Sequence, residues 1–149
     1  MTNAGADKAA WSTSEGRHTL IVTEAITHLP LKKADMVAAQ IHDADSDEVM
    51  IRLIKTSLFV EFKPTGVKQT HELTPSYQLG TFYTVKIEAS DGEIRVFYED
   101  MTTPAMSFAN PKTGCYFKAG AYTHSNLEQG DAADAFGEVV ISALEVRHE

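Results

Sequence analysis

Residues 116–122 read Tyr116-Phe117-Lys118-Ala119-Gly120-Ala121-Tyr122 and decide the fold of this chain. Side chains of a β-strand point to alternate faces, so a strand here places Lys118, Gly120 and Tyr122 on one side. The glycine between a cation and a phenol leaves room for a ligand to approach the backbone. We therefore expect a strand with one face built for binding or catalysis.

A second stretch has the same design. Residues 37–42 read Val37-Ala38-Ala39-Gln40-Ile41-His42, in which Gln40 and His42 share a face and the apolar Ala39 and Ile41 share the other. If the polar faces of the two strands meet, an amide, an imidazole, an ammonium group and a phenol converge. Such a set of groups is suited to removing a proton beside a carboxylate.

Length and composition indicate one soluble domain over residues 1–149. Hydrophobic residues make up 43% and charged residues 23%, which argues against wholesale disorder. No apolar run approaches the roughly 20 residues of a membrane helix, and the first residues lack the apolar centre of a signal peptide. The net charge of -8 argues against nucleic acid or anionic membranes as partners. A polyanionic substrate would need the few cations to gather on one face.

Period-two alternation recurs along the chain, whereas helical spacing of apolar residues is rare. Ser90-Asp91-Gly92 supplies a hairpin turn of the Asp-Gly type. We expect strands at residues 18–28, 36–42, 49–54, 58–62, 82–89, 94–98, 115–123 and 137–147. Many short strands in one domain predict an all-β, antiparallel sandwich, and the long strands favour a jelly roll with a concave face for an extended ligand.

Gln40-Ile41-His42 and residues 116–122 resemble two of the three signature strands of the alginate lyases of polysaccharide lyase family 7. Several further stretches resemble the connecting sequence of these enzymes: Trp11-Ser12-Thr13-Ser14, His18-Thr19-Leu20, Ala25-Ile26-Thr27-His28-Leu29-Pro30, Tyr77-Gln78-Leu79-Gly80 and Phe136-Gly137-Glu138-Val139-Val140. The resemblance therefore covers nearly the whole chain.

The resemblance implies a β-jelly roll that cleaves alginate, an acidic polysaccharide, by β-elimination without a metal or organic cofactor. It implies that His42 and Tyr122 transfer protons, that Gln40 binds the substrate carboxylate and that Lys118 lies in the same groove. Ile41 between the glutamine and the histidine favours guluronate-containing substrate. The family resemblance also implies an extracellular location.

Two departures from the family pattern stand out. The family commonly has glutamine two residues after the second tyrosine, where this chain has His124. Its third signature, an Arg-Ser/Thr-Glu-Leu-Arg strand, lies just before a stretch that resembles Met1–Lys8, and Arg17 is no match for it. We therefore expect an N-terminally shortened domain that lacks the family's first strands.

Two other functions stay open from the sequence. One is a catalytically inactive, carbohydrate-binding jelly roll that keeps the groove without the arginine. The other is a jelly-roll glycoside hydrolase, which is disfavoured because the two signature strands offer no pair of facing carboxylates.

For the other candidate residues the sequence favours structural roles over functional ones. The single cysteine, Cys115, has aromatic neighbours and fits a small buried residue better than a nucleophile. The remaining histidines show no metal-ligand spacing with cysteine or acidic residues. Residues 43–48 resemble the start of a calcium loop but lack its glycine at position six, and Ile54 stands where the loop needs glutamate. Trp11 and Tyr77 suit burial at least as well as stacking on sugars.

Overall fold

The computed structural model describes residues 10–29, 35–43, 47–64, 67–123 and 137–149. Regular structure in these residues consists of strands. The strands are β1 Arg17–His28, β2 Asp35–His42, β3 Asp47–Ile54, β4 Ser57–Phe62, β5 Gln69–Thr74, β6 Phe82–Ser90, β7 Glu93–Tyr98, β8 Met106–Ala109, β9 Tyr116–Thr123 and β10 Glu138–His148. The described part of the chain contains no helix that could span a membrane.

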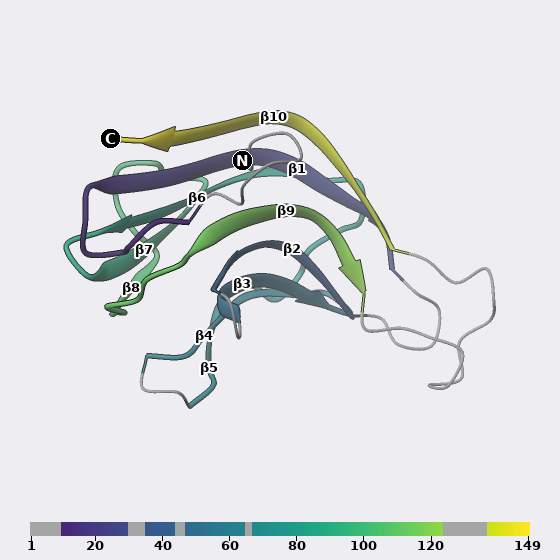
Figure 1. Ribbon diagram of the computed structural model, residues 1–149. Helices are drawn as coiled ribbons and strands as arrows, with labels where there is room; N and C mark the ends of the chain where they lie inside the picture. The colour runs from purple at the N-terminus through teal and green to yellow at the C-terminus, as the bar shows by residue number, and fades with distance from the viewer. Residues whose placement is uncertain (1–9, 30–34, 44–46, 65–66, 124–136) are drawn as a thin grey trace.

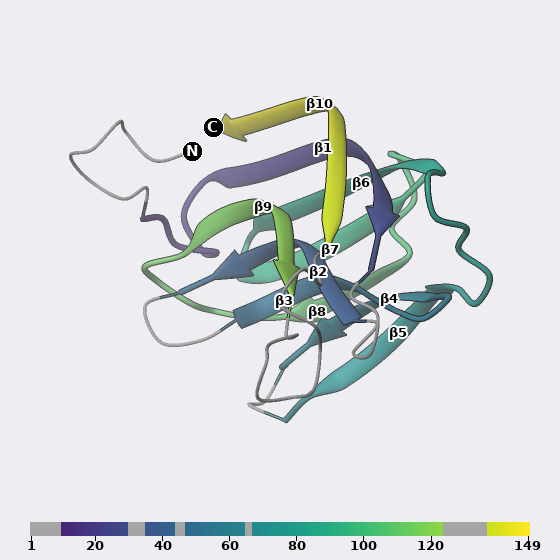
Figure 2. The same cartoon turned by 90° about the vertical axis from the view of Figure 1, so that its right-hand side faces the viewer.

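The strands form two antiparallel sheets that pack face to face (Figures 1 and 2). One sheet has the strand order β10-β1-β6-β7-β8 and the other the order β5-β4-β3-β2-β9. Figure 1 shows β9, β2 and β3 as nested arches whose concave side faces away from the β1 sheet. The predicted all-β antiparallel sandwich is confirmed.

Apolar side chains from both sheets fill the space between them. They form one buried core, which includes Leu20, Val22, Ile26, Ile41, Ile51, Leu53, Ile87 and Phe117. Each of these residues alternates with a neighbour on the other side of its strand, as the period of two requires. The sheet that contains β2 and β9 therefore buries one face and presents the other outward.

The hairpin turn between β6 and β7 was predicted from the sequence, whereas the strands β5 and β8 were not. Asp91 and Gly92 both have positive φ, 55° and 71°, which is the geometry of the predicted Asp-Gly hairpin turn between β6 and β7. β5 is polar and mostly exposed, and β8 has four residues. Neither strand carries the repeated apolar alternation by which the longer strands were recognised.

Candidate active site

The outer face of the sheet formed by β5, β4, β3, β2 and β9 is called the site face below. Ile41 of β2 and Phe117 of β9 are directly opposite each other and both belong to the core. Because side chains alternate, the residues that flank these two lie on the site face. The core partners thus fix which side chains face outward.

The flanking residues are themselves paired across the strands. Gln40 lies opposite Lys118, and His42 lies opposite Tyr116. Opposed residues of an antiparallel pair share a face and have their Cβ atoms about 5 Å apart. An amide, an ammonium group, an imidazole and a phenol therefore meet on the site face.

Tyr122 stands further along β9. Its backbone lies opposite Val37, five positions before His42 on β2, which is roughly 16 Å along a strand at ~3.3 Å per residue. The side chain of Tyr122 lies outside the described part of the structure, as does His124. The proton-transfer role of Tyr122 stays a prediction that rests on the motif.

The histidine ring has a defined tautomer. His42 Nδ1 makes a hydrogen bond with the backbone carbonyl of Asp43 and lies 3.3 Å from the Tyr116 hydroxyl. A carbonyl oxygen only accepts, so Nδ1 carries the hydrogen. In neutral His42 the lone pair is then on Nε2, which is the atom able to take a proton from a substrate.

Tyr116 was missed as a site residue, although the same alternation rule identifies it two positions before Lys118. Its ring centroid lies 5.5 Å from that of His42. The Nζ atom of Lys118 lies 5.6 Å from the centroid of the Tyr116 ring. Tyr116 therefore contacts the imidazole and lies beneath the cation.

Gln40 is almost fully buried although it lies on the outer side of the sheet. Its exposed fraction is 5%, and its Oε1 has no hydrogen-bond partner among the described residues. A buried acceptor without a partner costs free energy in the folded chain, on the order of 1–3 kcal/mol. A ligand hydroxyl or N–H group at this position would satisfy it.

A buried ion pair lies further along the site face. Arg52 of β3 stands opposite Val37, and its Nη1 donates to Oε1 of Glu61 over 2.6 Å. Both side chains are buried. Neither residue stands out in the sequence, because the pair depends on the register of β3 and β4 and not on either residue alone.

Gly120 has a backbone reason to be glycine. Its φ is 146°, a conformation that residues with a Cβ rarely adopt. It lies where the pairing of β2 with β9 is irregular, between the Ala39–Ala119 and Val37–Tyr122 partners. The glycine therefore permits the irregularity that sets the position of Tyr122 relative to Lys118.

Cys115, Trp11 and Tyr77 are buried, as their structural interpretation requires. Cys115 is buried and forms an isolated β-bridge with Trp11. Burial, followed by the nearby charges of Glu48 and Asp43, raises the pKa of the Cys115 thiol to about 11, so a thiolate nucleophile is not available near neutral pH. Trp11 and Tyr77 are both buried in the core. The centre of the calcium-like stretch, residues 44–46, lies outside the described residues.

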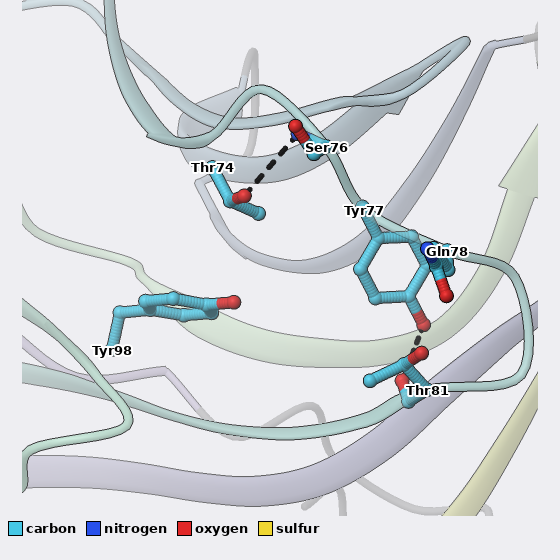
Figure 3. A pocket seen from close by; sticks show the side chains of 6 residues that line it. All are labelled: Thr74, Ser76, Tyr77, Gln78, Thr81 and Tyr98. Carbon is cyan, nitrogen blue, oxygen red and sulfur yellow. Dashed lines mark hydrogen bonds between the residues drawn. The ribbon is translucent and has the colours of Figure 1, made fainter.

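A separate hollow of about 270 Å³ lies beside the loop between β5 and β6 (Figure 3). The Tyr77 hydroxyl donates to the carbonyl of Thr81 over 2.6 Å, and the Ser76 N–H donates to the Thr74 hydroxyl over 3.3 Å. None of its lining residues is charged, so it offers no ionic partner for a uronate. They are Thr74, Ser76, Tyr77, Gln78, Thr81 and Tyr98.

Comparison with known proteins gives a consistent result. A family model described as alginate lyase matches residues 1–148. The solved structure of the alginate lyase AlgAT5 from polysaccharide lyase family 7 is 48% identical with a TM-score of 0.91, and the match covers 100% of this chain and 67% of that one. No curated protein matches the chain.

Two further structures extend the comparison. An alginate lyase from Corynebacterium sp. is 36% identical, with a TM-score of 0.90 and coverage of 100% of this chain and 66% of that one. A truncated AlyQ with CBM32 and alginate lyase domains is 29% identical, with a TM-score of 0.86 and coverage of 97% and 44%. The chain thus spans about two thirds of the length of the first two structures. It belongs to the alginate lyases of polysaccharide lyase family 7, and its sandwich is the jelly roll of that family.

Proposed function

We propose that the site face cleaves alginate by β-elimination and leaves an unsaturated uronate at the new end. The observation that carries this proposal is the meeting of Gln40, His42 and Lys118 across β2 and β9 in a chain of the alginate lyase family. The chemistry of the reaction assigns each group a task.

Elimination breaks the C5–H bond beside the carboxylate and the C4–O bond to the next sugar, and it forms a double bond between C4 and C5. Removing the proton builds a second negative charge on a group that is already anionic. Fixed donors must therefore lie where this charge develops, and losing one donor costs about 3 kcal/mol in the transition state. In this proposal the Gln40 amide and the Lys118 ammonium group, which lie opposite each other across β2 and β9, supply these donors.

His42 is the base in this proposal. Its Nδ1 is held by the Asp43 carbonyl, so Nε2 takes the C5 proton. Tyr122 gives its phenolic proton to the leaving O4, with Lys118 able to favour the resulting phenolate. For a mannuronate unit the C5 proton lies on the leaving-group side, where Tyr122 can act as both base and acid. Ile41 supports guluronate-containing alginate as the substrate, and the family supports an extracellular location.

Ultraviolet absorbance of unsaturated ends tests the proposal. We expect alginate incubated with the chain to gain this absorbance, and we expect His42→Ala to slow it by 10²–10⁴-fold, the usual contribution of a general base. His71→Ala is the matched control, because His71 is an exposed histidine on β5. Equal rates for the two variants would contradict the role of His42.

The two tyrosines of β9 sharpen the test. Tyr122→Phe should abolish elimination, whereas Tyr116→Phe should retain it, because Tyr116 contacts His42 without transferring a proton. Loss of activity in Tyr116→Phe and retention in Tyr122→Phe would indicate that Tyr116 donates the proton. Alginate binding that never yields unsaturated ends would indicate the carbohydrate-binding alternative, and new reducing ends without a double bond would indicate a hydrolase.

A further inference from the structure

Two histidines outside the site face lie opposite each other where β10 ends beside the start of β1 (Figure 1). The neighbouring residues Arg17 and Glu149 exchange both backbone hydrogen bonds, over 3.0 and 2.8 Å. His18 and His148 therefore form the next pair without backbone bonds, in which opposed side chains are closest. Their Nδ1 atoms are 2.7 Å apart.

Two ring nitrogens at this separation can share one proton, so at least one of them presents a lone pair. His18 Nε2 lies 2.7 Å from the carbonyl oxygen of Glu15 and must donate to it. Neutral His18 then has its lone pair on Nδ1, directed at His148. Histidines that ligate metals are held in the same way, with the second ring N–H on a backbone carbonyl or carboxylate.

The surroundings of the pair favour a bound species. Trp11 stacks on His18 with ring centroids 4.4 Å apart and an angle of 13° between the planes. Trp11, His18, His148 and Ala10 line a hollow of about 270 Å³. Trp11 is 8% exposed, and its indole Nε1 has no hydrogen-bond partner among the described residues. The hollow thus lies directly beside the two imidazoles.

We propose that His18 and His148 bind a divalent transition-metal ion of the zinc class through their two Nδ1 atoms. Imidazole nitrogen is a preferred ligand for Zn²⁺, Cu²⁺ and Ni²⁺. The proton between the rings moves to Nε2 of His148, so that both Nδ1 lone pairs face the ion. Water fills the remaining positions around the ion.

The geometry requires a small adjustment. Metal–nitrogen bonds of about 2.0–2.1 Å at tetrahedral angles place the two nitrogens roughly 3.3 Å apart, which is wider than the observed contact. The exposed side chain of His148 can supply this shift, while His18 is held by Trp11 and Glu15.

Among the described residues no group of three or more histidine, cysteine or acidic side chains could hold a metal ion. The site therefore has two protein ligands. Its affinity for the ion should depend on both of them, because losing either leaves a single imidazole.

Calorimetric titration with Zn²⁺ tests this site. We expect one ion per chain, a rise in the thermal unfolding midpoint that EDTA reverses, and at least tenfold weaker binding in His18→Asn and in His148→Asn. His71→Asn is the matched control for an exposed histidine on another strand. His148→Asn decides the result if His18→Asn fails to fold, since His148 is exposed.

Spectra of the Cu²⁺-loaded protein report the nitrogen ligands of the ion. A purely structural role of His18 and His148 would not change this signal. Two nitrogen ligands are expected in the wild type and fewer in either variant. Absence of Zn²⁺ binding, or binding of equal strength in wild type, His148→Asn and His71→Asn, would overturn the proposal. Binding that is lost equally in His71→Asn would show a nonspecific surface effect and would also overturn it.

Discussion

The buried carboxyl groups of Glu61 in one sheet and Glu24 in the other are held in opposite ways. Glu61, on the site face, accepts from Arg52 over 2.6 Å and lies 3.7 Å from the Nζ of Lys68. Glu24, in the core between the sheets, accepts from the Tyr83 hydroxyl over 2.7 Å, and its Oε2 has no hydrogen-bond partner among the described residues. One carboxylate has cations beside it and the other has a neutral phenol.

The difference has a physical consequence for ionisation. Burial raises the pKa of Glu24 to about 7, and the hydrogen bond from Tyr83 offsets only part of this effect. The core therefore carries a carboxyl group that is half protonated near neutral pH. The site face instead pairs the Glu61 carboxylate with Arg52, so the two charges cancel where an anionic polysaccharide is proposed to bind.

Breaking the ion pair on the site face should have the largest effect on stability. Arg52→Met leaves Glu61 buried, and within the described part of the chain its remaining ion-pair partner is the exposed Lys68, 3.7 Å away. We expect a loss of about 3–5 kcal/mol in the free energy of unfolding, measured by urea denaturation. The double variant Arg52→Met/Glu61→Leu should recover most of this loss because it removes the charge as well. A double variant as unstable as the single one would show that packing, and not charge, dominates.

Raising the pH should have the next largest effect, through Glu24. Its folded-state pKa of about 7 lies above the ordinary value of 4.5, so the stabilising contribution is complete below pH 4.5 and is lost as pH rises through 7. Between pH 4.5 and pH 7 this group lowers the free energy of unfolding by about 3 kcal/mol. Urea unfolding at pH 5 and pH 8 should show a smaller pH-dependent loss in Glu24→Gln than in the wild type. An identical loss in both proteins would assign the pH dependence to other groups.

Removing the unpaired acceptor of Gln40 should have the smallest effect on stability and a large one on activity. Gln40→Met replaces a buried oxygen, which has no hydrogen-bond partner in the described part of the chain, with an apolar side chain of similar size, so we expect a change within about 1 kcal/mol. The rate of elimination should fall by 10²–10³-fold, as for loss of one donor to the developing charge. Unfolding and ultraviolet assays on the same samples separate the two effects. A large loss of stability would give Gln40 a structural role.

The sequence predicted most strands because long alternating runs occupy one buried face each. It did not predict β5, whose residues are polar and mostly exposed, or β8, where only Phe108 is buried. These two strands depend on hydrogen bonds to β4 and β7, which no local pattern reveals.

The candidate site, like the fold, could be predicted from the sequence only in part. Alternation placed Gln40 with His42 and Lys118 with Gly120 and Tyr122, but only the register set Gln40 opposite Lys118 and His42 opposite Tyr116. Arg52 with Glu61, and His18 with His148, are contacts across strands whose partners have no sequence relationship that marks them. Local periodicity therefore predicts a face, whereas pairing between strands determines which groups meet on it.

The most direct test of the account is the rate at which unsaturated uronate ends form from alginate with the wild-type chain, His42→Ala and His71→Ala measured side by side. We expect absorbance that grows with the wild type and with His71→Ala and stays near background with His42→Ala. Absence of unsaturated ends with the folded wild type, or an undiminished rate with His42→Ala, would contradict it.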